Sequence, residues 1–243
     1  MIEADNLSKQ FRDRKRRVIR AADGVTFRCE PGRVYGLLGA NGAGKTTTLR
    51  MLATILTPTG GTARVAGYDI RHQAEKVRAS IGFLSTATAL YARLTALEMV
   101  EYFGRLCGLE GQVLRQRALA IFQRFEMNDF RDRRCDQLST GMKQKVSIAR
   151  TLIHDPPVMI FDEPTLGLDV MTSRTITQFI RECRERGKTV LFSTHAMSEA
   201  EKLCDVVGII HNGSLLAEGS LAELRQRYRE DHLEDIFVKV VQA

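Results

Sequence analysis

Short apolar segments rich in β-branched residues recur along the chain, and several of them are apolar on both faces. This pattern is typical of central strands that helices cover from both sides of a sheet. Helical patterns of apolar residues occur at Thr46–Ile55, Val170–Arg186 and Met197–Cys204. Their alternation with the strands predicts an α/β fold with a largely parallel, wound sheet. The expected strands are 25–29, 33–39, 81–85, 157–164, 189–195 and 206–213.

The middle of the chain breaks this rhythm between about residues 87 and 154. Consecutive amphipathic helical patterns occupy this stretch, and no strand pattern separates them. We therefore expect a helical subdomain inserted into an α/β core made of about residues 1–86 and 155–220. The helical patterns are 94–109, 111–125 and 139–153.

The last part of the chain carries a hairpin signal and a short tail. The Asn212-Gly213 pair lies between two apolar segments, and this dipeptide favours a two-residue hairpin loop. We therefore expect an antiparallel pair after the last core strand. The tail, 221–243, begins as a helix and ends in the alternating apolar segment IFVKVV. No internal repeat and no low-complexity linker is visible.

Composition places the chain among ordinary globular proteins, with 44% hydrophobic and 27% charged residues in 243. The N-terminus has no signal-peptide pattern, and no apolar run approaches the ~20 residues that cross a bilayer. Any role at a membrane is therefore expected to depend on a partner or a surface contact. Five scattered cysteines without C-x-x-C spacing favour a reducing cytosol over a disulfide framework or zinc site. They are Cys29, Cys107, Cys135, Cys183 and Cys204.

The net charge of +7 is unevenly distributed, and its densest point is the run Arg12–Arg20. One interpretation is the solvated tip of a hairpin; the other is contact with anionic lipid headgroups or nucleic acid. No aromatic residues interleave with the basic ones, so base stacking is not favoured. We expect no nucleic-acid partner.

A phosphate-binding loop lies at GANGAGKTT, residues 39–47, between an expected strand and an expected helix. It fits the pattern G-x-x-x-x-G-K-[ST], in which glycines let the backbone wrap around phosphates. Lys45 is expected to reach the β- and γ-phosphates, and the Thr46 hydroxyl is expected to ligate Mg²⁺. The residues expected to contact ATP in this loop are Gly39, Asn41, Gly42, Ala43, Gly44, Lys45, Thr46 and Thr47.

Two carboxylates follow the buried strand pattern of PVMIFDEP, where ligands of open α/β sheets bind. Asp162 is expected to hold Mg²⁺ through water, and Glu163 to polarise the attacking water. Two adjacent acids often only cap the next element, so the interpretation depends on the phosphate loop in the same chain.

Five motifs occur in the order found in ABC-type ATPases, and together they span nearly the whole chain. They are the phosphate loop, LSTGM at 138–142, FDEP at 161–164, LGLD at 166–169 and the His195 that ends TVLFSTH. The chain therefore resembles this family. The resemblance implies one nucleotide-binding domain over residues 1–243, with a P-loop core, a helical subdomain and an antiparallel β part. It also implies a head-to-tail dimer that encloses two ATP molecules.

The same resemblance assigns roles to residues outside the phosphate loop. It implies that Ser139 and Gly141, in the family's signature motif, bind the γ-phosphate of ATP held by the other subunit. It places Asp169 at the dimer seam. His195 is implied to contact the γ-phosphate and to orient the attacking water together with Glu163.

Four positions have a second interpretation or depart from the family pattern. Phe11 matches the aromatic that stacks on adenine, although a phenylalanine there is equally explained as a core residue. Thr140 and Met142 differ from the usual LSGGQ signature. Thr86 stands where the family places a glutamine that ligates Mg²⁺, and its shorter side chain reaches the ion only through a water. The hypothesis is that the nucleotide site is coupled to the membrane subunit by contacts of neighbouring residues more than by a direct metal ligand.

Several segments are most similar to ATP-binding subunits of the Nat-type, sodium-extruding exporter branch. They are 82–95, 138–150, 154–172 and 233–240. The resemblance implies an ATPase subunit at the cytoplasmic face of the cell membrane, which powers sodium efflux through a separate membrane-spanning permease. The alternatives are an exporter of drugs, antibiotics or polysaccharides, and a soluble ABC ATPase that acts on ribosomes or nucleic acid.

Overall fold

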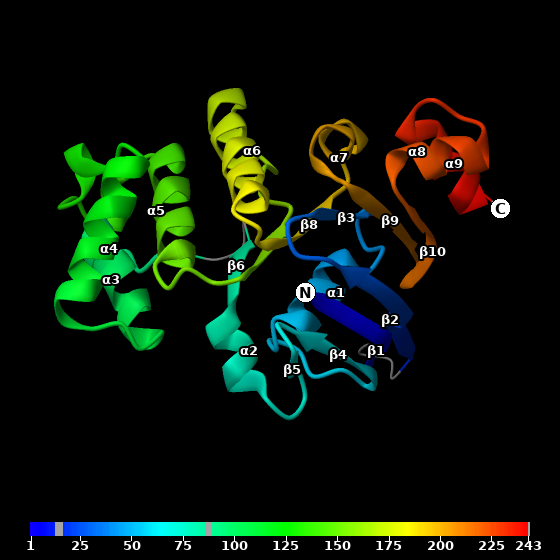
Figure 1. The fold of residues 1–243 in the computed structure, drawn as a ribbon, viewed down its shortest axis with the longest axis horizontal. Coiled ribbons are helices and arrows are strands. Elements are labelled where there is room, and N and C mark those ends of the chain that lie inside the picture. The colour runs from blue at the N-terminus through cyan, green and yellow to red at the C-terminus, as the bar shows by residue number, and fades with distance from the viewer. Residues whose placement is uncertain (13–16, 86–88, 243) are drawn as a thin grey trace.

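The computed structural model describes residues 1–12, 17–85 and 89–242. A six-stranded sheet with the order β10-β9-β3-β8-β7-β6 forms its centre (Figure 1). All neighbouring strands in it pair in parallel except β9 and β10, which form an antiparallel hairpin at one edge. The strands are β3 (Val34–Leu38), β6 (Ile81–Ser85), β7 (Val158–Asp162), β8 (Thr189–Thr194), β9 (Val206–His211) and β10 (Ser214–Gly219).

The β9–β10 hairpin confirms the turn expected at Asn212-Gly213. Both residues have positive φ, 47° and 85°, as a two-residue type I′ turn requires. The amide of Gly213 also donates to the carbonyl of Ala43 at 2.9 Å. The hairpin therefore supports the phosphate loop from one side.

A second, antiparallel sheet has the order β2-β1-β4-β5. Its strands are β1 (Ile2–Arg12), β2 (Val18–Cys29), β4 (Gly60–Val65) and β5 (Tyr68–Asp69). Only the last residues of β2 matched a strand expected from the sequence. The register of β1 shifts at three places along β2, and these irregularities interrupt the alternation that identifies a strand.

The described ends of the basic run lie on β1 and β2, where Arg12 and Val18 are register partners. Residues 13–16 of that run lie outside the described part of the chain. The choice between a solvated tip and a lipid contact therefore stays open.

Three helices between β6 and β7 form where the amphipathic patterns predicted them, and they lie side by side at one end of the molecule (Figure 1). Their 3₁₀ turns, Asn128–Phe130 and Cys135–Gln137, connect α4 to α5. The helices of the chain are α1 (Lys45–Leu52), α2 (Ala74–Ser80), α3 (Ala96–Leu106), α4 (Gly111–Arg124), α5 (Thr140–Leu152), α6 (Val170–Glu185), α7 (Met197–Leu203), α8 (Leu221–Tyr228) and α9 (Leu233–Gln242).

The alternating segment of the tail is helical and forms α9. Leu233, Ile236 and Val240 are buried there, at the spacing of one helical face. These side chains pack with residues of α7 and β9 in a small apolar cluster. Helical burial of this face explains the apolar residues of the tail.

Both faces of the central sheet are covered, as the apolar strands predicted. On β7, Met159 and Phe161 pack among the helices α3 to α6, whereas Val158 and Ile160 pack toward α1 and the antiparallel sheet. In the register of β7 with β8, Asp162 lies opposite Ser193. The carboxyl ends of the buried strands β7 and β8 therefore bring polar residues together at one edge of the sheet.

Candidate active site

The phosphate loop connects the end of β3 to the start of α1. Gly44 has a φ of 111°, and a Cβ placed there would lie 2.3 Å from the carbonyl oxygen of Ala21. Only glycine fits this conformation and this close approach. No side chain caps α1, so its first N–H groups and the positive end of its dipole are available to an anion. The loop and Glu163 enclose a hollow of about 150 Å³.

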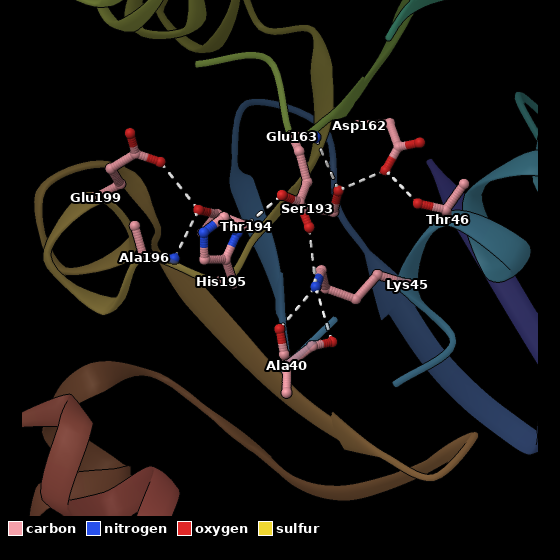
Figure 2. Close-up of polar contacts among 11 residues, drawn as sticks. Ala40, Lys45, Thr46, Asp162, Glu163, Ser193, Thr194, His195, Ala196 and Glu199 are labelled. Carbon is pink, nitrogen blue, oxygen red and sulfur yellow. Dashed lines mark hydrogen bonds and ion pairs between the residues drawn. The ribbon is translucent and has the colours of Figure 1, made fainter. Parts of the chain in front are cut away.

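Lys45 is buried in this hollow, with 4% of its surface exposed. Its Nζ donates to the carbonyls of Gly39 and Ala40, at 2.6 Å and 3.1 Å. It also forms an ion pair with Glu163 Oε1 at 3.0 Å (Figure 2). A phosphate bound to the loop would compete with Glu163 for this ammonium group.

Asp162 receives two hydroxyl groups on one of its oxygens. Thr46 Oγ1 donates to Asp162 Oδ1 at 3.0 Å, and Ser193 Oγ donates to the same oxygen at 2.9 Å (Figure 2). A carboxylate and a hydroxyl are hard oxygen donors, which suit Mg²⁺. Within the described ranges, no group of three or more His, Cys, Asp or Glu residues could hold a metal ion. Thr46 and Asp162 are too few ligands to hold a metal ion alone. They fit a Mg²⁺ that ATP phosphates and water also coordinate.

Glu163 lies between two basic side chains. Its Oε1 pairs with Lys45, and its Oε2 accepts from His195 Nδ1 at 2.8 Å. Burial alone would raise the pKa of Glu163, but hydrogen bonds and charge from Lys45 and His195 outweigh burial and lower the pKa. The carboxylate is therefore ionised at neutral pH. A hollow of about 200 Å³ lies beside Glu163 and His195.

The turn after β8 holds His195 in place through its neighbours. Thr194 Oγ1 donates to Glu199 Oε2 at 2.9 Å and accepts from the amide of Ala196 at 3.0 Å (Figure 2). These two bonds fix the backbone on both sides of the histidine. Sequence reasoning identified His195 but missed Thr194 and Glu199, as it missed Ser193.

The signature residues lie at the start of α5, and contacts of the described residues join neither of them to the phosphate loop. Ser139 caps α5, because its Oγ accepts from the amide of Met142 at 3.3 Å. A Cβ on Gly141 would lie 3.2 Å from Thr172 Oγ1 of α6. Asp169 caps α6, accepting from the Thr172 amide at 3.0 Å and its hydroxyl at 2.7 Å. The N-terminus of α5 therefore lies next to the N-terminus of α6.

Comparisons with known proteins show which family has this fold. Residues 22–166 match the ABC transporter family. The chain is 44% identical to the ABC transporter ATP-binding protein NatA of Bacillus subtilis, over 98% of this chain and 97% of that protein. This chain belongs to the ABC transporter family. Its relatives also include the daunorubicin/doxorubicin resistance ATP-binding protein DrrA of Streptomyces peucetius, 39% identical over 85% of this chain and 62% of DrrA.

Solved structures of ABC cassettes share the fold. The ATP-binding subunit of an ABC transporter superposes with a TM-score of 0.88 at 28% identity and covers 99% of both chains. The dimeric cassette MJ0796 bound to ADP and Pi superposes with a TM-score of 0.82 at 29% identity, over 90% of this chain and 98% of that one. The expected ABC-type α/β fold is confirmed. The chain is an ABC ATPase that acts on ATP with Mg²⁺.

The aromatic residue expected to stack on adenine lies outside the cluster around Lys45. Phe11 lies on β1 opposite Ile19, with 39% of its surface exposed, so the alternative of a core residue is wrong. The Lys9 ammonium lies 5.3 Å from the centroid of its ring. Adenine stacking on Phe11 stays a prediction. Thr86 lies outside the described residues.

Proposed function

We propose that this ABC ATPase powers sodium export through a separate membrane-spanning permease, to which it binds at the cytoplasmic face of the membrane. The observation that carries the proposal is the 44% identity with NatA over nearly the whole length of both proteins. The four segments similar to the Nat-type, sodium-extruding branch support the same cargo. In the described ranges, no helix is both long and apolar enough to cross a bilayer.

The proposed site residues divide the reaction into binding, metal retention and orientation of water. Lys45 and the loop amides bind the β- and γ-phosphates, while Thr46 and Asp162 hold Mg²⁺, with Asp162 acting through water. Bound Mg²⁺ neutralises charge on the phosphate oxygens. Glu163 and His195 orient and polarise a water for in-line attack on the γ-phosphate. The ion pair between Lys45 and Glu163 supports this assignment, because phosphate binding at Lys45 would free the carboxylate for water.

We further propose that the active site is completed by a second copy of the chain. Ser139 and Gly141 of that copy would face the γ-phosphate, and Asp169 would lie at the seam. Three apolar side chains beside Asp169 support a covered surface, because Leu166, Val170 and Met171 are 52%, 82% and 71% exposed. The dimeric MJ0796 cassette, bound to ADP and Pi, supports the same assembly.

A second candidate function is the export of a drug or antibiotic. The 39% identity with DrrA, the daunorubicin/doxorubicin resistance protein, favours it. The ATPase chemistry of this candidate is the same, since the cargo path would lie in the permease.

Transport by membrane vesicles tests the choice between these cargoes. The chain is purified with the multi-spanning protein that accompanies it, and both are placed in vesicles with ATP outside. Uptake of radioactive sodium that stops in the Glu163→Gln variant is the expected result. ATP-dependent uptake of daunorubicin without sodium uptake would favour the drug exporter. Co-purification with ribosomes and no membrane protein would contradict both.

A further inference from the structure

Ser193 joins the two carboxylates of the site through a single hydroxyl group. It lies on β8 opposite Asp162 in the parallel register, and its surface is 0% exposed. Its Oγ donates to Asp162 Oδ1 at 2.9 Å and accepts from the backbone amide of Glu163 at 3.1 Å (Figure 2). A serine hydroxyl has one proton to donate, so Asp162 receives it and the Glu163 amide occupies an acceptor site.

The backbone at Glu163 needs such support. Its φ is 46°, in the left-handed region that costs a non-glycine residue free energy. This conformation turns the chain directly after β7, so that Asp162 meets Thr46 while the next side chain meets Lys45 and His195. Both the hydroxyl and the carbonyl of Ser193 accept from the Glu163 amide, the carbonyl at 3.2 Å. The contacts of Ser193 therefore bind both sides of the turn.

We propose that the Ser193 hydroxyl is a positioning group for ATP hydrolysis, which holds the metal-side carboxylate of Asp162 and the water-side carboxylate of Glu163 in one fixed arrangement. This inference rests on the roles proposed above for these two carboxylates. The hydroxyl touches neither ATP nor the attacking water, and it acts only through Asp162 and Glu163. Because the residue is fully buried, removing its oxygen leaves the Asp162 carboxylate without one of its two hydroxyl donors inside the protein.

The test compares three variants of the full-length chain. Ser193→Ala removes the oxygen and leaves the backbone carbonyl contact. Ser193→Cys keeps a side chain of similar shape with a weaker donor and acceptor. Ser147→Ala is the matched control, because Ser147 is also a buried serine but lies in the middle of α5.

A positioning role predicts a change in turnover rather than in nucleotide affinity. Ser193→Ala should lower kcat by about 10- to 100-fold, as the loss of a group that orients metal and catalytic ligands does. The Kd for ATP in EDTA, where Mg²⁺ is absent, should stay within about threefold of wild type, since the phosphate loop is unaltered. Ser193→Cys should fall between wild type and Ser193→Ala. Ser147→Ala should keep the wild-type kcat.

A second readout does not depend on turnover. In the Glu163→Gln background, calorimetry measures ATP binding with and without Mg²⁺. Adding Ser193→Ala should reduce the gain in affinity that Mg²⁺ provides by about 10-fold or more, because Asp162 loses one of its two hydroxyl donors. An unchanged gain would contradict the role of Ser193 toward Asp162.

The outcomes separate this inference from the proposed function. If Glu163→Gln hydrolyses ATP at the wild-type rate, the roles proposed for the carboxylates are wrong. If Glu163→Gln is inactive while Ser193→Ala keeps a wild-type kcat, only the positioning role is wrong. An equal loss in Ser193→Ala and Ser147→Ala, in proportion to a lower melting temperature, would identify a purely structural serine.

Discussion

We propose that two helix N-termini of this chain, those of α1 and α5, bind phosphate. The residues around these two N-termini differ. At α1, Glu163 pairs with the buried Lys45 and with His195, and Ser193 joins Asp162 to the Glu163 backbone. At α5, Ser139 only caps its own helix, and Gly141 lies beside the start of α6. The first region holds the groups that we propose take part in hydrolysis, together with the residues that contact them. The second offers backbone donors without a charged partner, as a surface that completes another subunit's site would.

The largest expected effect comes from a substitution beside the phosphate loop. Glu163→Gln keeps the shape of the side chain but removes the negative charge that we propose polarises the attacking water. We expect the rate of ATP hydrolysis to fall by about 10²- to 10⁴-fold while ATP still binds. The protein should then accumulate as an ATP-bound dimer, which phosphate release and light scattering together detect.

Glu182→Gln is the control for this change, because Glu182 is an ion-paired carboxylate on α6 whose partner is Arg124. It should leave the rate of hydrolysis near that of wild type. A Glu163→Gln protein that stays monomeric at saturating ATP would count against the shared site.

Mixing two inactive variants tests whether the two regions belong to different subunits of one site. Lys45→Ala should lower hydrolysis by about 10²- to 10³-fold, because it removes the cation that we propose stabilises charge on the transferred phosphate. Ser139→Arg should also inactivate the homodimer by filling the surface offered to the partner's phosphate. An equal mixture should regain roughly a quarter of the wild-type rate, since about half of random dimers are mixed and each holds one intact site of two. Confirmed heterodimers without recovered activity would contradict the sharing.

Two glycine substitutions sharpen the contrast between the regions. Gly44→Ala forces a Cβ to within 2.3 Å of a backbone oxygen at a positive φ, so we expect about 1–3 kcal/mol of destabilisation and loss of ATP binding. Gly141 has no positive φ, and its added Cβ meets only the end of a side chain at 3.2 Å. Gly141→Ala should change stability by about 1 kcal/mol or less, because alanine also favours the helix.

Urea unfolding measures both effects, and hydrolysis then distinguishes the two glycines. Gly141→Ala should lower ATP hydrolysis by about 10-fold while ATP binding by the single chain is unchanged, because a methyl group would separate the partner's phosphate from the α5 amides. Wild-type hydrolysis in this variant would show that no phosphate approaches Gly141 closely.

The two regions also differ in how far the sequence alone predicted them. The five parallel strands of the central sheet and the three inserted helices were predictable, because burial on both faces or on one helical face leaves a regular apolar pattern. The motif order identified Lys45, Thr46, Asp162, Glu163 and His195, which the structure brings into one network. Assignment of catalytic roles to them stays a prediction, as does the role of Ser139 and Gly141 toward a second chain.

Other features left no usable signal in the sequence. The strands β1 and β4 are half-exposed and irregular in register, so their side chains do not alternate cleanly. Ser193 could not be selected, because a serine within an apolar strand pattern resembles any other buried hydroxyl. Its importance follows from the register that places it opposite Asp162, which depends on how β7 and β8 align in space. Thr194 and Glu199 were also missed. Their contact depends on how the end of β8 and the start of α7 lie relative to each other in space.

The last prediction compares two serine caps, to distinguish helix capping by Ser139 from phosphate binding at α5. Ser139 and Ser220 both cap a helix with Oγ, at 3.3 Å from the amides of Met142 and Glu223. Replacing either by alanine should lower the free energy of unfolding by about 0.5–2 kcal/mol, because one helix amide loses its acceptor. Urea unfolding should therefore place the two variants close together. ATP hydrolysis at a temperature where both are folded should fall only in Ser139→Ala, since α8 lies at the opposite end of the molecule from α5 (Figure 1). Equal hydrolysis in the two variants would reduce Ser139 to a helix cap, and the contribution of the second subunit would then rest on the α5 backbone amides alone.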